Sequence, residues 1–163
     1  MGTTRVREHL TGQGWTGEIL EFAESSATVE LAAEKVGTAP ARIAKTLGFY
    51  DAERPGQAVM VVVAGDAKVN GGRYKRAFGV KPRMLQGDDV LTLTGYPIGG
   101  VCPFAHAPSA RVFLDESLRR FETVFPAAGT ATSAVEIPVT ELAQLSGAEG
   151  WVDVSVGWRP DPA

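Results

Sequence analysis

Stretches with helical and with strand periodicity alternate along this chain. Residues 3–12 have the pattern of a short helix, and apolar residues recur every three or four positions between Thr28 and Gly37. Thr28 is a suitable N-cap for that second helix, and Gly37 is a suitable stop. Asn70 is placed to begin a short basic helix that ends at Phe78. We therefore expect several short helices in the first half of the chain.

Two neighbouring segments have the pattern of strands. Residues 43–50 alternate, and residues 59–64 are a continuous apolar run rich in β-branched side chains, which is typical of a strand covered on both faces. We expect these two strands to pair antiparallel. Further strands are predicted at Pro82–Leu85, Arg111–Leu114, Thr123–Phe125, Val135–Ile137 and Trp151–Val156, with helices begun by Asp88 or Asp89 and at about Thr140–Leu145. This irregular order predicts an α+β fold with a mixed sheet, curled or closed into a barrel, and short flanking helices.

Length and composition indicate one globular domain over residues 1–163. The chain is 44% hydrophobic and 21% charged, and its longest apolar run, Ala58–Ala64, is much shorter than a membrane span. No signal sequence is recognisable at the N-terminus, so we expect a cytoplasmic protein. One cysteine and two histidines exclude an internal disulfide and a Cys/His zinc site. We expect neither a metal nor a cofactor.

The net charge of −3 disfavours a general nucleic-acid binder, yet one stretch is strongly basic. Residues 66–83 contain one acidic residue, Asp66, and the cations Lys68, Arg73, Lys75, Arg76, Lys81 and Arg83. Such a run is often only a solvated helix face. The alternative is a surface that binds phosphates.

Lys45 is an unusual residue for its predicted strand. It shares the parity of Ile43, Leu47 and Phe49, so alternation directs it toward the side where large apolar groups are buried. A buried ammonium is costly and is usually kept for an anion or for function. The alternatives are a lysine whose stem covers apolar surface, or an inward charge that protects a sheet edge.

Residues 95–103, Gly-Tyr-Pro-Ile-Gly-Gly-Val-Cys-Pro, form the second candidate feature. Adjacent glycines leave the backbone bare, so its N–H groups can bind an anion or a carbonyl oxygen, as in an oxyanion hole. A plain connecting loop is the alternative. Cys102 and His106 could form a thiol site, but no group that would orient the imidazole is evident. A helix-capping role explains Asp115 at least as well as a catalytic role does. The common catalytic motifs are absent.

These segments together resemble the YbaK/ProX family, free-standing domains similar to the editing domain of bacterial prolyl-tRNA synthetase. The likeness runs from about residue 22 to residue 156. It rests on Ile43-Ala44-Lys45-Thr46-Leu47, Val61-Val62-Val63-Ala64-Gly65-Asp66, Gly95–Phe104 with its G-x-x-x-P motif at Gly99 to Pro103, and Val112–Ser117. The resemblance implies hydrolysis of mischarged tRNA, typically tRNA for proline that carries alanine, cysteine or another small residue.

The resemblance also implies roles for particular residues. Lys45 would hold the aminoacyl-adenosine end, and the backbone of Gly99 and Gly100 would hold the scissile carbonyl. Further substrate-binding positions are Phe22, Thr46, Pro103, Thr132 and Ser133, and the tRNA-binding positions are Lys68, Arg73, Lys75 and Arg76. Thr132 and Ser133 stand where cysteine-removing members often have a hydroxyl and a carboxylate, and Ala105 stands where a glycine is common.

The function expected from the sequence is therefore a deacylase that edits mischarged tRNA in trans without a protein nucleophile. Its partners would be mischarged tRNA and, as a further candidate, prolyl-tRNA synthetase, and the protein would be a monomer or homodimer. A non-catalytic module of the same fold that binds a tRNA end, a nucleotide or a protein is the alternative.

Overall fold

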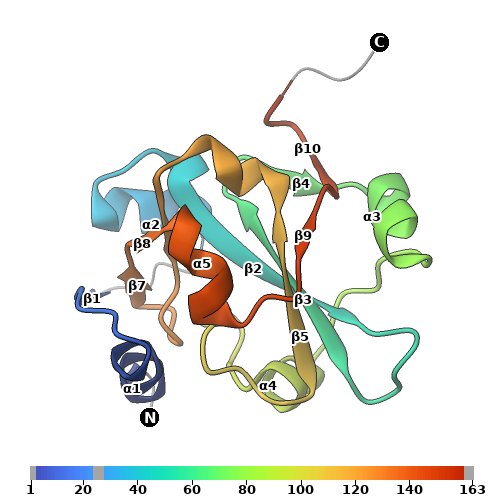
Figure 1. Ribbon diagram of the computed structural model, residues 1–163, viewed down its shortest axis with the longest axis horizontal. Coiled ribbons are helices and arrows are strands. Elements are labelled where there is room, and N and C mark those ends of the chain that lie inside the picture. Colours follow the sequence, from blue (N-terminus) through green and yellow to red (C-terminus); the bar gives the residue numbers. More distant parts are fainter. Residues whose placement is uncertain (1–2, 24–27, 160–163) are drawn as a thin grey trace.

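The computed structural model in Figure 1 describes residues 3–23 and 28–159. Its helices are α1 (Thr4–Gly12), α2 (Val29–Val36), α3 (Gly71–Phe78), α4 (Asp89–Thr94) and α5 (Val139–Ser146), with the 3-10 turns η1 (Pro40–Arg42) and η2 (Glu116–Arg120). Its strands are β1 (Ile19–Glu21), β2 (Ile43–Tyr50), β3 (Ala58–Ala64), β4 (Lys68–Val69), β5 (Ala110–Asp115), β6 (Thr123–Pro126), β7 (Ser133–Val135), β8 (Ile137–Pro138), β9 (Trp151–Val152) and β10 (Ser155–Val156).

A mixed sheet with the strand order β8-β6-β2-β3-β5-β9 forms the centre of the molecule. β2 and β3 pair antiparallel along seven residue pairs, as predicted, and Lys45 lies opposite Val63. β3 pairs parallel with β5, and β2 pairs parallel with β6. The sheet curls into half a barrel, and α5 lies to the left of β5 in the view of Figure 1. The predicted α+β fold with a mixed, curled sheet is therefore confirmed.

Helix ends follow the capping residues that the sequence provides. The Thr28 hydroxyl accepts the Leu31 N–H at the start of α2, and the Asn70 side chain accepts the Arg73 N–H at the start of α3. Gly37 takes a left-handed conformation, with φ of 72°, where α2 ends. These local signals depend on neighbouring residues alone, and the predicted helices are confirmed. The expected cap at Asp88 or Asp89 is the exception, because α4 begins at Asp89 without a side-chain cap.

Three predicted strands are wrong in detail. Pro82–Leu85 forms only one isolated bridge, between Met84 and Phe49, and its hydrogen bonds to β2 are those of the Arg83 C=O and the Leu85 N–H. The predicted strand Val135–Ile137 divides at Glu136, so that its first residue belongs to β7, which pairs with β1, and its last to β8, which pairs with β6. Residues 151–156 divide in the same way, since β9 joins β5 and β10 joins β4. In both cases the chain changes sheets, which periodicity alone does not reveal.

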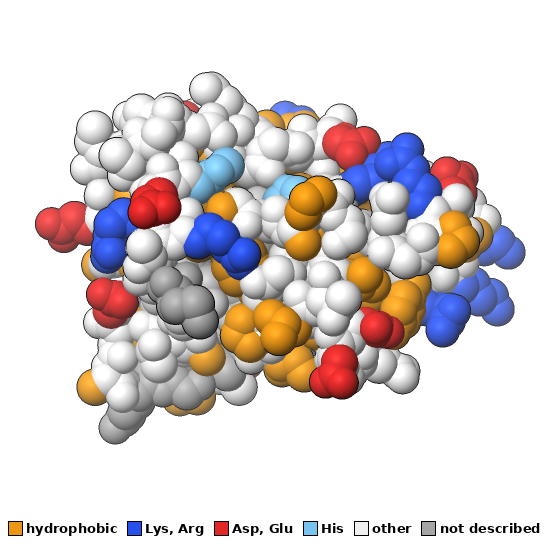
Figure 2. Space-filling view, turned by 90° about the horizontal axis from the view of Figure 1, so that it is seen from below, with side chains coloured by type: hydrophobic (Ala, Val, Ile, Leu, Met, Phe, Trp, Pro, Cys, Tyr) orange, Lys and Arg blue, Asp and Glu red, His pale blue; other side chains and the backbone are white. Residues whose placement is uncertain are grey.

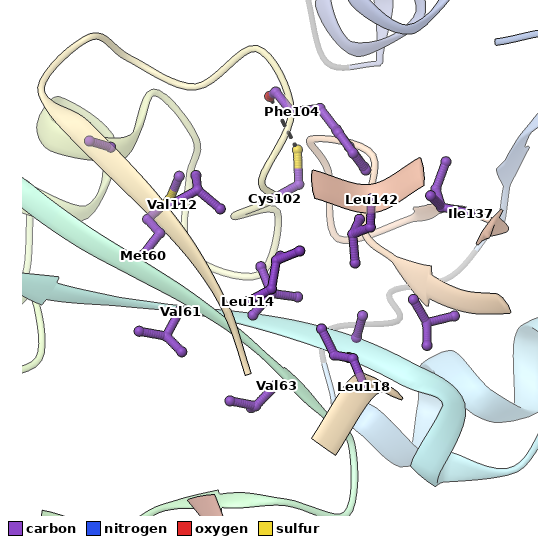
Figure 3. Close-up of a cluster of buried hydrophobic side chains, with 14 of the residues drawn as sticks. Met60, Val61, Val63, Cys102, Phe104, Val112, Leu114, Leu118, Ile137 and Leu142 are labelled. Atoms are coloured by element: carbon purple, nitrogen blue, oxygen red, sulfur yellow. Dashed lines mark hydrogen bonds between the residues drawn. The ribbon is translucent and has the colours of Figure 1, made fainter. Parts of the chain in front are cut away.

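The core lies between the central sheet and α5. Every residue of β3 is buried, as the continuous apolar run predicts. Figure 3 shows Met60, Leu114 and Leu142 among the side chains that fill this core, and Cys102 lies with them beside Phe104. A separate small cluster joins α2 to the start of β2 and to β6; it consists of Ala32, Ala33, Ile43 and Phe125. This second cluster positions α2 beside the start of β2.

Within the described residues, no helix is long and apolar enough to cross a membrane.

Candidate active site

A cavity of about 400 Å³ opens where β2 is not fully paired. Its walls come from α2, β2, α4, the glycine loop (residues 95–103), β6 and the segment of residues 127–134. The lining residues are Thr28, Val29, Ala32, Ile43, Ala44, Lys45, Thr46, Leu47, Gly48, Met84, Leu85, Val90, Thr94, Ile98, Gly99, Val101, Phe125, Ala127, Ser133 and Ala134. Most are apolar, and Lys45 is the charged residue among them. The cavity therefore combines one cation with a largely hydrophobic wall.

Lys45 lies half-buried in this wall, and its ammonium has no hydrogen bond or ion pair among the described residues. Burial lowers the pKa of its ammonium, and the nearby positive charge of Lys68 lowers the pKa further. The carboxylates of Asp66 and Glu30 oppose this effect at longer range. The position agrees with the expectation drawn from strand parity. An unpaired ammonium facing a cavity is available to a ligand.

The two adjacent glycines of the loop have different environments. Gly99 lines the cavity with φ of 90°, a conformation that favours glycine. Gly100 is buried outside the cavity lining, and its N–H donates to the Pro97 carbonyl at 2.9 Å. Pro103 is also buried and lies outside the lining. The structure thus brings Gly99 and Val101 to the cavity, and gives Gly100 a packing position behind them.

Ala105 continues this loop in a left-handed conformation, with φ of 48°. In the described part of the chain, it is the only non-glycine residue with a positive φ. The backbone therefore has the shape suited to glycine at this position, although the side chain is a methyl group.

Thr46 lines the cavity, and its hydroxyl is buried without a hydrogen-bond partner in the described structure. Native proteins pair nearly all buried hydroxyls, so such a group needs an explanation. A bound ligand inside the cavity would supply the missing partner.

The predicted polar side chains in the segment of residues 127–134 form hydrogen bonds within that segment. Ser133 lines the cavity, but its hydroxyl donates to the Thr130 carbonyl at 3.2 Å and accepts the Thr130 hydroxyl at 2.8 Å. The Thr132 carbonyl accepts the Phe22 N–H at 2.7 Å, and both residues lie outside the cavity lining. The structure therefore brings Ser133 to the cavity, whereas Thr132 and Phe22 stabilise its surroundings.

Of the four predicted tRNA-binding residues, Arg73 is held in an ion pair, whereas the other three are exposed. Arg73 forms an ion pair with Asp153 at 3.3 Å, and its side chain is 16% exposed. Lys75 and Arg76 are exposed on α3, which projects from one side of the molecule (Figure 1). Lys68 is exposed on β4, near enough to Lys45 to lower the pKa of that ammonium. Lys68 thus links the basic stretch to the cavity.

The thiol has no catalytic surroundings. Cys102 is fully buried, its Sγ–H donates to the Phe104 carbonyl at 3.6 Å, and burial raises its pKa to about 11. The His106 ring bonds to the adjacent Ala107 carbonyl at 2.9 Å. Asp115 caps η2 by accepting the Ser117 N–H, which confirms its capping role. Among the residues that the structure describes, no cluster of acidic, histidine or cysteine side chains could hold a metal.

The sequence did not identify the apolar wall and the rim of the cavity. Val29 and Ala32 of α2 contribute to the wall, and so does Phe125 of β6. Ile98 and Met84 are 74% and 54% exposed at the rim, and Ile98 directly precedes Gly99. Figure 2 shows that hydrophobic patches lie between charged side chains on the lower face of the molecule. An apolar residue beside paired glycines was the one signal in the sequence that could have indicated this rim.

Comparison with known proteins gives consistent matches over this fold. The family model of the aminoacyl-tRNA editing domain matches residues 23–145. The "Uncharacterized protein YwhH" of Bacillus subtilis (strain 168) is 45% identical over 159 residues, covering 98% of this chain and 100% of that protein.

Solved structures extend the comparison. The "hypothetical protein APE2540" is 31% identical, with a TM-score of 0.83 over 93% of this chain and 99% of that one. A protein called "a putative trans-editing enzyme for prolyl tRNA synthetase" is 30% identical, with a TM-score of 0.84 over 95% of this chain and 97% of that one. The family match covers most of the chain, and the cavity lies within it. The chain therefore belongs to the aminoacyl-tRNA editing domain family, the YbaK family.

Proposed function

We propose that this protein is an aminoacyl-tRNA deacylase that acts in trans and removes a small, wrongly attached amino acid, with tRNA for proline as the expected carrier. The observation that carries the proposal is that Lys45 and Gly99, distant in sequence, line one cavity in a chain of the editing family. The name of the solved trans-editing relative supports the same substrate class. Residues 1–163 would act as one editing domain, as a monomer or homodimer, in the cytoplasm where tRNA is charged.

The proposed reaction is ester hydrolysis by water. The water oxygen bonds to the carbonyl carbon, and the C=O electrons move onto the carbonyl oxygen. Collapse of this intermediate breaks the bond to the ribose oxygen, which takes a proton that originates from the water and leaves as a hydroxyl. The products are the free amino acid and the uncharged tRNA. No protein nucleophile is required, in agreement with the inert surroundings of Cys102.

The developing oxyanion needs hydrogen-bond donors. Gly99 and Val101 line the cavity, and in the described structure no hydrogen bond uses their N–H groups. One such donor contributes about 3–4 kcal/mol to the transition state in well-studied acyl-transfer enzymes. Lys45 would place its ammonium against the ribose or the terminal phosphate, because a desolvated cation interacts strongly with an anion.

The wall offers apolar contacts to the side chain of the amino acid. Ala32, Ala127 and Ala134 contribute methyl groups, and Phe125 adds a bulky surface. Synthetases reject a smaller analogue by only about 1–3 kcal/mol per methylene, so a second site that admits only small groups improves accuracy. Lys68, Lys75 and Arg76 would contact tRNA phosphates outside the cavity.

The test is to incubate the protein with tRNA for proline charged with alanine, serine, cysteine or proline, and to follow the loss of the ester. The proposal expects rapid loss of at least one small amino acid and retention of proline. Lys45→Ala should slow the reaction about ten- to a hundredfold. Arg54→Ala, which removes an exposed cation in the β2–β3 turn, is the control. If no charged tRNA is hydrolysed but tRNA binds, the protein is a binding module.

A further inference from the structure

The edge of β2 that faces the cavity has one gap in its hydrogen bonding. Along a strand, the N–H and C=O of alternate residues point to the same side. Gly48 accepts the Leu85 N–H, and the Tyr50 N–H donates to Arg83, so the even-numbered residues of β2 point away from β3. Thr46 belongs to this set. Its main-chain N–H and C=O therefore point to the edge that borders the cavity.

The neighbours of Thr46 on this edge have partners, whereas Thr46 does not. The pairing of β2 with β6 ends at Ala44, opposite Pro126, and the bonds to residues 83–85 begin at Gly48. Between these points no strand pairs with β2 on this side, and, within the described residues, none of the main-chain hydrogen bonds outside the ladders uses the N–H or C=O of Thr46. The Thr46 hydroxyl also lacks one. Three polar groups of one residue are thus left unsatisfied beside a cavity, and buried main-chain groups are rarely unpaired.

We propose that the main chain of Thr46 binds the aminoacyl group of the substrate as if that group were one residue of an added strand. The α-amine donates to the Thr46 C=O, and the Thr46 N–H donates to the ester carbonyl oxygen. This inference rests on the deacylase function proposed above, and it assigns the part of the site that recognises the amino acid rather than the tRNA.

The chemistry of the two partners is complementary. In an antiparallel hydrogen-bonded pair, each residue donates its N–H to the C=O of the other. An aminoacyl ester carries an equivalent donor, the α-amine, and an equivalent acceptor, the ester carbonyl, on its α-carbon. Among the residues that the structure describes, no carboxylate lines the cavity, and the amine finds its acceptor in a carbonyl. The Thr46 N–H also becomes a donor to the oxyanion when water attacks, together with the glycine loop.

The pairing also determines which side of the sheet the amino-acid side chain occupies. Opposed residues of an antiparallel pair have their side chains on the same face, with Cβ atoms about 4.5–5.5 Å apart. An L-amino acid therefore places its side chain beside that of Thr46, whereas a D-amino acid directs it toward the face of Lys45. The structure thus predicts a preference for the L-isomer and a requirement for an N–H or O–H donor on the α-carbon.

The experiment uses tRNA esters of equal size, with kcat/KM divided by the uncatalysed hydrolysis rate of each ester. L-Alanyl and L-lactoyl esters carry a donor on the α-carbon, the propionyl ester carries none, and D-alanyl reverses the configuration. We expect propionyl and D-alanyl to lose about ten- to a hundredfold relative to L-alanyl, with lactoyl between. Equal values for propionyl and L-alanyl would overturn the inference. Failure to hydrolyse any ester would instead refute the proposed deacylase function.

A change in the protein tests the other half of the pair. Replacing Thr46 by its α-hydroxy analogue turns its amide into an ester and removes the N–H, while the side chain is kept. We expect kcat/KM for L-alanyl-tRNA to fall about tenfold or more. The same replacement at Ala52, which is exposed in the β2–β3 turn, is the control. If both proteins fold and have the same activity, the Thr46 N–H does not contact the substrate.

Discussion

Gly100 packs directly against Gly129. A methyl group built on Gly100 would lie 2.7 Å from the Gly129 carbonyl oxygen and 2.9 Å from the Thr130 Cα, both of which belong to the backbone. Gly129 itself has φ of 98°, so its conformation also favours glycine. The glycine loop is therefore fixed to the segment between β6 and β7 by a contact that admits no side chain. This contact sets the position of Gly99 relative to the far wall of the cavity.

Gly100→Ala should destabilise the protein and reduce its activity together. Backbone cannot yield as a flexible side chain can, so we expect a loss of about 1–3 kcal/mol of unfolding free energy. Gly71→Ala is the matched control, because nothing lies within 4 Å of its added methyl group at the start of α3. Urea denaturation of the three proteins measures the difference. Equal stability of the Gly100 and Gly71 variants would contradict the packing role.

Lys45→Met should stabilise the fold while it reduces deacylation. Burial lowers the pKa of Lys45 in the folded protein, so the folded state holds this proton less tightly than the unfolded state. The resulting penalty is complete below the lowered pKa and disappears as pH rises through that pKa toward the unfolded value. The gain in stability should therefore shrink at alkaline pH. Thermal unfolding at several pH values measures this trend, and a variant less stable than the parent at neutral pH would refute it.

Ala105→Gly should stabilise the protein. The left-handed conformation of Ala105 costs about 1–2 kcal/mol for a residue with a Cβ, and glycine avoids that cost. The more flexible unfolded chain offsets about 0.4–1 kcal/mol, so a net gain of about 0.5–1 kcal/mol is expected. Ala107→Gly, two residues later, has no positive φ to relieve and should lose stability. Denaturation midpoints of both variants make the comparison, and a less stable Ala105 variant would contradict the expected strain.

The exposed cations of α3 should contribute to tRNA affinity and leave the chemical step unchanged. Replacing Lys75 and Arg76 by Gln should weaken binding and reduce the slope of log K against log salt by roughly 0.7–0.9 for each phosphate that the protein no longer neutralises. Arg73→Gln should instead reduce stability, because its ion pair with Asp153 joins α3 to the chain after β9. Binding titrations at several salt concentrations measure the slopes. An unchanged slope in the double variant would show that tRNA binds elsewhere.

Cys102→Ala should retain deacylase activity. The thiol is fully buried, and its pKa of about 11 keeps it protonated at neutral pH. We expect a loss of about 1 kcal/mol in stability from the smaller side chain and little change in kcat/KM. Alkylation of the parent should be slow until the protein is unfolded. A loss of activity beyond about a hundredfold in the folded variant would indicate a thiol mechanism.

Those parts of the fold that depend on local interactions could be predicted from the sequence. Thr28 and Asn70 cap helices because their side chains reach a backbone N–H three residues away. The continuous apolar run of β3 reports burial on both faces directly. The division of the predicted strand Val135–Ile137 between two sheets was missed, because its two ends pair with different strands, β1 and β6. Local pattern does not contain that choice.

The same distinction applies to the candidate site. The sequence alone predicted that Lys45 is directed toward an apolar face and that the backbone of residues 95–103 can bind an anion or a carbonyl oxygen. The folded chain was needed to show that Gly99 faces the cavity while Gly100 packs on Gly129, and that the Ser133 hydroxyl is already bonded to Thr130. The gap at Thr46 likewise exists because β6 ends its pairing at Ala44 and the bonds to residues 83–85 begin at Gly48. Hydrogen bonds between distant segments satisfy or leave free each polar group, so the set of groups available to a substrate is fixed only when the chain has folded.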